Sequence, residues 1–192
     1  MFRTVTSEAD APDVAVLLGL AFDPQDINHW LVDDPAERRE RMTGWFEILT
    51  RHAIAGAGRV VVAEDGTAAA VWFDNTSEGS APDDYDERLA AVAGPHLPRV
   101  PELDELLEKH HPAEPHWHLA FLVVHPAWQR RGIGSKLMQH TYGELAAPIY
   151  LEATTVASRT LYETRHGFER MTPADISTAG GPPFHRMWRP GL

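Results

Sequence analysis

The most informative pattern of apolar and polar residues in the chain lies in one stretch, His116 to Met138. Its first part is an apolar run over 119–124, rich in β-branched and aromatic residues, which predicts a buried strand over 117–124. Pro126 cannot donate to a sheet ladder, so the strand is expected to end just before it. A turn with two glycines follows, and apolar positions at helical spacing then predict an amphipathic helix over 135–147. The unit therefore reads as strand, glycine turn and helix.

Upstream of this unit, the pattern predicts a strand, two helices and a hairpin. Ser7 or Asp10 is expected to cap the first helix, and the second should begin near Pro35, since proline is tolerated in a first helical turn. Two apolar runs joined by Asp65-Gly66 predict a β-hairpin. The expected ranges are a strand over 2–6, a loop over 23–26, hairpin strands over 59–63 and 68–73, a loop over 77–82, and short helices over 83–93 and 101–111.

Downstream, a second buried strand is expected over 149–153, followed by a helix over 158–166 that ends at Gly167. Two last strands are expected over 168–171 and 184–188, connected by a loop rich in proline and glycine. No internal repeat or linker divides the chain, and 192 residues are enough to bury one full core. A single domain over residues 1–192 is therefore predicted.

Composition and charge narrow the class of protein. No cysteine is present, which excludes a disulfide framework and a thiol nucleophile. No stretch reaches the length of a membrane span, and the N-terminus lacks the apolar core of a signal peptide, so a cytoplasmic protein without membrane contact is expected. The net charge of −11 makes nucleic acid an unsuitable partner. That charge is uneven, because residues 1–115 carry a net −14 and residues 116–192 a net +3.

The glycine turn has the composition of an anion site. The first turn of a helix leaves backbone N–H groups without partners and carries the positive end of the helix dipole. Gly132 and Gly134 allow a phosphate to approach that backbone, and Arg130, Arg131 and Lys136 add positive charge. The spacing matches neither a P-loop nor a dinucleotide-binding Gly-x-Gly-x-x-Gly. The alternative reading is an ordinary strand-to-helix turn with glycines for geometry.

Two motifs carry a resemblance to a known family. The strand end Val124-His125-Pro126, followed by Gln-x-x-Gly-x-Gly over 129–134, resembles the pyrophosphate-binding motif of the GNAT superfamily of acyl-CoA-dependent N-acyltransferases. Leu-Tyr-Glu over 161–163 and Gly-Phe over 167–168 resemble the C-terminal signature of that superfamily, with three residues between Glu and Gly where the usual reading has two. A finer resemblance, to the puromycin N-acetyltransferases and their actinobacterial relatives, is carried by segments 63–66, 70–72, 114–120, 151–152 and 162–163.

The resemblance implies an α/β (α+β) fold, in which a mixed, mostly antiparallel sheet of six to seven strands is flanked by helices. Two central strands, here 117–124 and 149–154, would splay apart to admit acetyl-CoA as cosubstrate. The backbone of Leu122, Val123 and Val124 would pair with the pantetheine arm, and Ser158 would flank its other side. The pyrophosphate would be held by Gln129, Arg130, Arg131, Gly132, Ile133, Gly134 and Ser135.

The implied chemistry needs two proton transfers, because an amine must lose a proton before it attacks and the departing thiolate must gain one. The resemblance assigns the role of general acid to Tyr162. His118, on the central strand, is a candidate base because an imidazole titrates in the right range. Glu152, on the neighbouring strand, is the second candidate, and a water chain ordered by both would serve equally well. The alternative for each residue is a structural polar group.

Two other kinds of site are not supported. The histidines at 110, 111, 116 and 118 cluster in the sequence, and His-x-His on a strand can bind zinc. No cysteine and no acidic ligand at a motif spacing accompany them, so no metal is expected. A serine hydrolase is not indicated, because the chain has no Gly-x-Ser-x-Gly.

The sequence therefore predicts an acetyl-CoA-dependent N-acetyltransferase that transfers its acetyl group directly, in a ternary complex, to a primary amine of a small molecule. An aminonucleoside or another antibiotic-like amine is one such acceptor, which would make the enzyme a resistance factor. Two alternatives stay open: a transferase that uses a protein or peptide amine or another acyl-CoA, and a non-catalytic CoA-binding sensor. Whether a homodimer forms through exposed strand edges is also open.

Overall fold

A seven-stranded sheet forms the centre of the protein in a computed structural model, which describes residues 1–77, 82, 84–94 and 99–191. The strand order is β1-β2-β3-β4-β5-β7-β6, and every neighbouring pair is antiparallel except β4 and β5. The expected mixed, mostly antiparallel sheet is confirmed. Its strands are β1 (Phe2–Thr4), β2 (Gly58–Ala63), β3 (Ala68–Asn75), β4 (His116–Val124), β5 (Ile149–Ala153), β6 (Glu169–Ile176) and β7 (Phe184–Arg189).

The hairpin of β2 and β3 is built as its turn residues predict. Asp65 accepts hydrogen bonds at Oδ1 from the backbone N–H of Thr67 (3.1 Å) and from its hydroxyl (2.6 Å). Gly66 takes the left-handed conformation, with φ of 71°, which glycine adopts without steric cost. The chain therefore reverses directly between the two strands.

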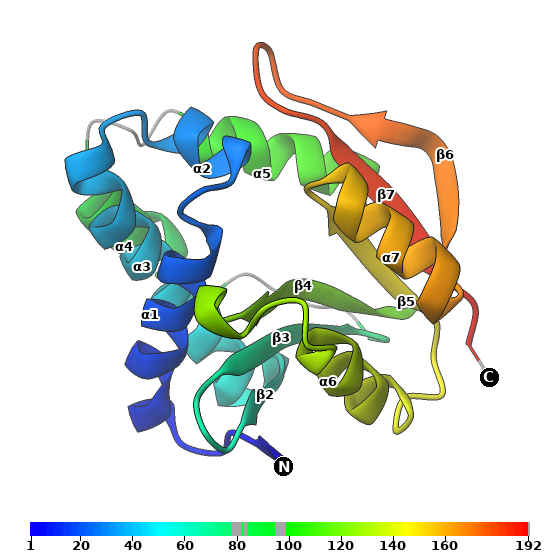
Figure 1. Cartoon of the computed structure of the whole chain (residues 1–192). Helices are drawn as coiled ribbons and strands as arrows, with labels where there is room; N and C mark the ends of the chain where they lie inside the picture. The colour runs from blue at the N-terminus through cyan, green and yellow to red at the C-terminus, as the bar shows by residue number, and fades with distance from the viewer. Residues whose placement is uncertain (78–81, 83, 95–98, 192) are drawn as a thin grey trace.

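The sheet splits between β4 and β5. These parallel strands pair only at Trp117 with Ile149 and at His118 with Tyr150. Beyond these two pairs β4 stays on β3, and β5 stays on β7. Figure 1 shows the two strands diverging from the end where they meet. The splayed central strands expected from the sequence are therefore present.

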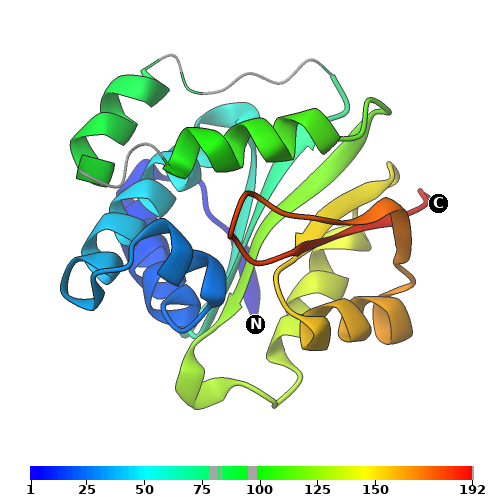
Figure 2. The ribbon, with the colours of Figure 1, turned by 90° about the horizontal axis from the view of Figure 1, so that it is seen from above.

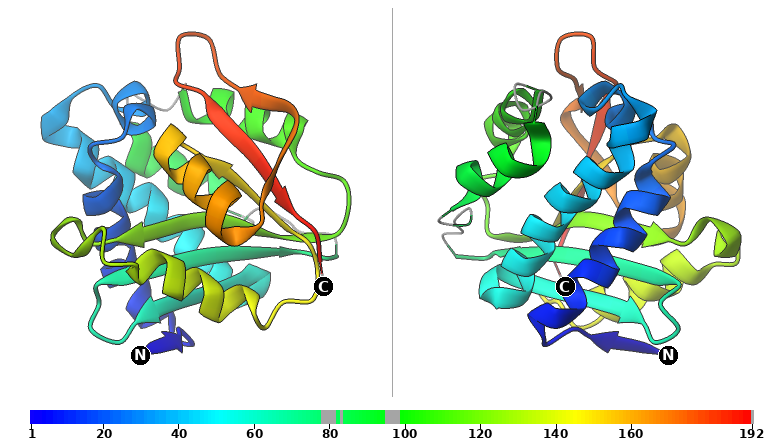
Figure 3. Two further views of the ribbon diagram at one scale, coloured as in Figure 1. Left: turned by 45° about the vertical axis from the view of Figure 1, so that its right-hand side comes forward. Right: turned by 90° about the vertical axis from the view of Figure 1, so that its left-hand side faces the viewer.

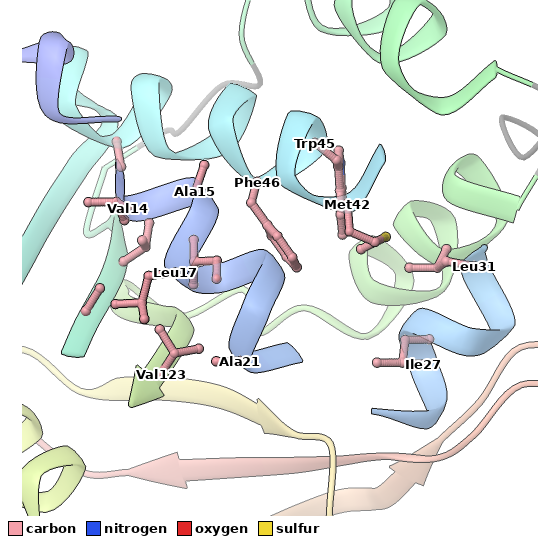
Figure 4. Close-up of a cluster of buried hydrophobic side chains, with 14 of the residues drawn as sticks. Val14, Ala15, Leu17, Ala21, Ile27, Leu31, Met42, Trp45, Phe46 and Val123 are labelled. Atoms are coloured by element: carbon pink, nitrogen blue, oxygen red, sulfur yellow. The ribbon is translucent and has the colours of Figure 1, made fainter. Parts of the chain in front are cut away.

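Helices cover both faces of the split sheet, as Figures 2 and 3 show from three further directions. One face packs against α1 (Ala11–Phe22), α2 (Asp26–Leu31), α3 (Pro35–His52), α4 (Tyr85–Ala93) and α5 (Arg99–His110). The other packs against α6 (Ile133–Tyr142) and α7 (Val156–His166). Each face has its own apolar cluster, and Figure 4 shows Val14, Phe46 and Val123 in the larger one.

Several expected boundaries differ from those observed. The helix expected over 135–147 begins at Ile133 and ends at Tyr142. The N–H of Gly143 donates to the carbonyls of Gln139 and Thr141 and so closes the last turn. Leu145 lies in the loop that follows and is still buried. The first strand stops at Thr4, and α2 begins inside the expected loop over 23–26. Residues 78–81 of the expected 77–82 loop, and residue 83 of an expected helix, lie outside the described residues. No helix in the described ranges is both long enough and apolar enough to cross a bilayer.

Candidate active site

A cavity of about 270 Å³ lies where the sheet splits. Its floor comes from β4 and β5, and one side from the first turns of α7. The opposite wall is aromatic, with Phe46 packed edge-on against Phe121 at 5.1 Å between ring centroids. Phe22, Trp45, Phe73 and Tyr85 extend this wall. The cavity therefore combines an apolar end with the polar groups of the diverging strands.

A bulge in β4 shapes the floor of this cavity. Leu119 pairs with Trp72 and Phe121 with Val71, so Ala120 is an extra residue in the ladder. One extra residue reverses the alternation of side chains along a strand. Phe121 consequently joins the aromatic wall, while Leu119 packs in the core on the opposite face.

His118 and Glu152 face each other across the split. His118 Nε2 lies 2.8 Å from Glu152 Oε2, and the side chains are only 16% and 7% exposed. Burial alone would raise the pKa of Glu152, but the charge of His118 and its hydrogen bond more than offset this and leave that pKa below its usual value. Since an ionised carboxylate only accepts hydrogen bonds, His118 Nε2 must carry the proton. In a neutral ring, Nδ1 is then the nitrogen able to accept a proton, and it has no hydrogen-bond partner in the described part of the chain.

Tyr162 reaches the same cavity from α7. Its ring packs against Phe168 at 5.7 Å and His166 at 6.3 Å between centroids. Burial raises the pKa of Tyr162 to about 12, so the hydroxyl keeps its proton at neutral pH. That hydroxyl forms no hydrogen bond within the described ranges, so its proton is available to a molecule in the cavity.

Two further histidines lie behind His118. His116 Nδ1 lies 2.6 Å from the carbonyl oxygen of Glu114 and must donate to it, so His116 Nε2 is the acceptor of a neutral ring. His111 Nε2 lies 3.0 Å from His116 Nε2 and 2.9 Å from Asn75 Nδ2. Burial, and then the charge of His118, lower the pKa of His111 to about 4; burial is also the main cause that lowers the pKa of His116. Both rings are therefore neutral near pH 7. Among the described residues, no three His, Asp or Glu side chains are grouped to hold a metal ion.

The glycine turn leads into the first backbone N–H groups of α6, which precede the hydrogen bonds of the helix. The first helical bond of α6 runs from the N–H of Lys136 to the carbonyl of Gly132, so the N–H groups of residues 133–135 precede it. Gly132 has φ of 77° and open space where a Cβ would stand. Arg130, Arg131 and Lys136 are exposed and form no ion pair among the described residues. An anion could approach this turn without displacing any protein group.

Three of the predicted binding side chains are engaged with the protein itself. The Gln129 amide donates to the carbonyl of Val124 (3.1 Å), and Ser135 Oγ lies 3.0 Å from His166 Nε2. Ser158 forms a capping box with Thr155 at the start of α7, although it also lines the cavity. These contacts shape the turn and the helix start, and a direct contact with a bound molecule stays a prediction for each of the three.

The peptide groups of β4 alternate between β3 and the split. The N–H of His125 donates to Thr67 on the β3 side at 2.8 Å. By strand alternation, the Val123 peptide also faces β3, while those of Leu122 and Val124 face the split. Of the three residues predicted to pair with an extended ligand, Leu122 and Val124 therefore direct their peptide groups into the split, and Val123 contributes its buried side chain to the core.

A second, larger cavity of about 1370 Å³ adjoins the first. The two share part of their lining, including Phe73, Tyr85 and Asp104. Sequence reasoning missed Asp104, although one signal was present: it interrupts the apolar stripe of α5 between Leu103 and Leu107. The acidic residues that line the larger cavity are Asp74, Asp86, Asp104, Glu105, Glu108 and Glu114.

Comparisons with known proteins agree with this geometry. The family model for the acetyltransferase (GNAT) family matches residues 25–168. The chain therefore belongs to the GNAT acetyltransferase family, a family of acyltransferases.

Among solved structures, the chain is similar to a protein of Corynebacterium glutamicum described as histone acetyltransferase HPA2 and related acetyltransferase. The identity is 25%, the TM-score 0.76, and the match covers 100% of this chain and 96% of the other. A polyamine N-acetyltransferase of Drosophila melanogaster is 18% identical, with a TM-score of 0.61 and coverage of 98% and 96%. Arylalkylamine N-acetyltransferase 2 of Aedes aegypti is 14% identical, with a TM-score of 0.59 and coverage of 99% and 98%. The last two show a shared fold.

Proposed function

We propose that the protein is an acetyl-CoA-dependent N-acetyltransferase that acts on a primary amine of a small molecule by direct transfer. The observation that carries this proposal is the meeting of three groups in one cavity: His118, its partner Glu152, and the Tyr162 hydroxyl, which has no hydrogen-bond partner among the described residues. They supply a proton acceptor and a proton donor on either side of the place where the sheet opens. The family model gives the reaction class to which this pair of groups belongs.

In the proposed reaction, the acceptor ammonium loses two protons in all, one before attack and one as the amide forms. His118 Nδ1 accepts them in turn and passes them to solvent, while ionised Glu152 holds the ring and stabilises its charged form. The C–N bond forms as the C–S bond of the thioester breaks. Tyr162 gives its proton to the departing thiolate and recovers one from solvent, so the net products are the amide, the CoA thiol and one proton.

The residues of the split and the glycine turn suit acetyl-CoA as cosubstrate. The Leu122 and Val124 peptide groups would pair with the pantetheine arm, and one N–H would stabilise charge on the thioester oxygen as it develops. The donors at the start of α6, together with Arg130, Arg131 and Lys136, would hold the pyrophosphate. The aromatic wall leaves an apolar space beside the reacting atoms, which favours a small organic amine as acceptor.

The test pairs calorimetric titration of acetyl-CoA with a thiol-release assay over a panel of amines that includes puromycin, diamines, arylalkylamines and a lysine peptide. Micromolar binding, with thiol released by one class of small amine, is the expected result. Release by the lysine peptide alone would replace the proposed acceptor class with a protein amine. Binding without release by any amine would favour a CoA-binding sensor, and absence of binding would refute the proposal.

A further inference from the structure

Asp104 occupies the wall that joins the two cavities. It lies on α5, one turn from Leu107, and lines both the cavity at the split and the larger cavity beside it. A carboxylate at this junction faces any molecule that passes from the larger cavity towards His118. Neither the His118–Glu152 pair nor the Tyr162 hydroxyl contacts it, and the proposed proton transfers do not use it.

Two aromatic side chains fix the orientation of this carboxylate. The Tyr85 hydroxyl donates to Asp104 Oδ2 at 3.0 Å, and the Trp45 Nε1–H donates to the Tyr85 oxygen at 2.9 Å. The second oxygen of Asp104, Oδ1, accepts no hydrogen bond from the residues that the structure describes. No Arg or Lys in those ranges forms an ion pair with Asp104. The carboxylate is therefore held in place from one side, and no residue of the described ranges acts as its counter-ion.

Burial makes this arrangement costly without a ligand. It raises the pKa of Asp104 to about 6, and the charges of Asp86 and Glu108 act in the same direction, while the Tyr85 hydrogen bond opposes them. At pH 7–8 the group is still mostly ionised, so it carries an uncompensated negative charge in a partly desolvated wall. A cation bound beside it would remove that penalty and return the pKa towards its ordinary range.

A second carboxylate, that of Glu152, lies in the same cavity. Glu152 gives Oε2 to His118, but its Oε1 is buried and has no hydrogen-bond partner within the described ranges. The side chain is only 7% exposed, and Glu152 lines the cavity. Apolar and aromatic side chains, including Phe73 and Phe121, also line this space. One continuous space therefore offers two negative groups and an apolar lining.

The larger cavity carries the same sign of charge. Six acidic residues line it, Asp104 among them, and no Lys or Arg does so among the residues described. Clefts lined by one sign of charge raise the local concentration of the opposite ion and speed its entry. A molecule that enters by this route is therefore expected to be positively charged.

We propose that the acceptor carries two cationic groups across an apolar spacer, so that its reactive ammonium reaches Glu152 and His118 while a second ammonium or guanidinium binds Asp104. The spacer, aliphatic or aromatic, packs on the aromatic wall. Tyr85 is a positioning residue that holds the Asp104 carboxylate. This inference rests on the proposed function, because it names the acceptor class of the same site.

The test compares each diamine with a monoamine of matched shape: 1,5-diaminopentane with pentylamine, and 1,4-bis(aminomethyl)benzene with benzylamine. The expected kcat/KM of at least one diamine exceeds that of its monoamine by about tenfold or more. In Asp104→Asn the KM for that diamine rises by about tenfold or more, whereas its kcat and the monoamine constants change by less than about threefold. Glu40→Gln removes one exposed charge away from both cavities and should change nothing.

Tyr85→Phe tests the positioning role through the pH dependence of diamine binding, which a purely structural role would leave unchanged. Without the phenol hydrogen bond the pKa of Asp104 rises further, so the acid limb of diamine binding shifts to higher pH while kcat is kept. Calorimetric binding of the diamine in the presence of CoA measures the same contact without turnover. Equal diamine affinity and selectivity in wild type and Asp104→Asn would overturn this inference while leaving the transferase intact. Loss of thiol release with every amine in the wild type, with Asp104-dependent diamine binding retained, would instead overturn the proposed function.

Discussion

Replacing Tyr162 with Phe is the sharpest test of the proposed chemistry, because the change removes little besides a proton donor. The ring contacts with Phe168 and His166 survive in a phenylalanine. The hydroxyl has no hydrogen-bond partner in the described ranges, so its loss leaves no protein group unsatisfied. The free energy of unfolding should therefore change by less than about 1 kcal/mol, and the affinity for acetyl-CoA should be kept.

The expected loss of activity follows from the role of a general acid. A positioned proton donor contributes about 10²- to 10⁴-fold to a rate, which is about 3–5 kcal/mol of transition-state stabilisation. Tyr162→Phe should lower kcat in the thiol-release assay by a factor in that range, with KM for acetyl-CoA nearly unchanged. Tyr142→Phe is the matched control, since that hydroxyl lies 3.3 Å from His166 Nδ1 and outside the cavity. It should retain kcat within about threefold.

The pH dependence adds a second check on the same residue. Burial raises the pKa of Tyr162 to about 12, so the phenol stays protonated throughout an ordinary assay range. Wild type should therefore show no loss of kcat from Tyr162 ionisation below about pH 10.5. If Tyr162→Phe keeps kcat within about threefold of wild type, the general-acid role is wrong. If it loses acetyl-CoA affinity together with kcat, Tyr162 acts in binding instead.

Two further predictions follow from the turn and the histidines. Gly134→Ala places a Cβ 3.4 Å from Val124 Cγ2 on an ordinary helical backbone, so the free energy of unfolding should stay the same or rise by about 0.5–1 kcal/mol. Calorimetry should show about tenfold weaker acetyl-CoA binding, because the Cβ would keep a phosphate from the backbone. Unchanged affinity would contradict a close approach of the phosphate. His111 has a lowered pKa of about 4, so the unfolded chain binds more protons between pH 6.5 and 4 and stability falls as the pH drops through that window. His111→Gln should flatten this loss by about 1–2 kcal/mol in urea titrations, after allowance for solvent screening, and an unchanged slope would count against a buried neutral ring.

The parts of the fold that the sequence predicted are those with local causes. Asp65-Gly66 specifies its hairpin turn by side-chain and backbone conformation alone, and Gly167 ends α7 with φ of 69°. The unit formed by β4, the glycine turn and α6 is similarly contiguous, so its spacing was informative. The predicted end of α6 was wrong because the prediction used the spacing of apolar residues alone. The buried Leu145 continues the helical spacing, although the helix has already ended at Tyr142.

The bulge at Ala120 had no local signal. Residues 119–124 are all apolar and do not alternate with polar residues, so the sequence does not show where side chains switch from one face of the strand to the other. Strict alternation would place Phe121 on the face opposite His118, yet the extra residue turns it towards the aromatic wall. The pairing of His118 with Glu152, 34 residues apart, depends in turn on where β4 and β5 separate. Sequence reasoning named both residues, whereas only the fold brings their atoms within 2.8 Å.

The residues proposed to bind the acceptor could not be predicted from the sequence, because they come from distant segments of the chain. Trp45 and Tyr85 are 40 residues apart, on α3 and α4, and only the tertiary structure brings them together. The uneven charge of the chain nevertheless has a spatial meaning. The acidic residues of the larger cavity all belong to residues 1–115, and the exposed basic side chains in and next to the glycine turn belong to residues 116–192. β4 begins at the boundary between these halves. In the proposed reaction, the basic side chains therefore attract the anionic cosubstrate and the acidic cavity attracts the cationic acceptor.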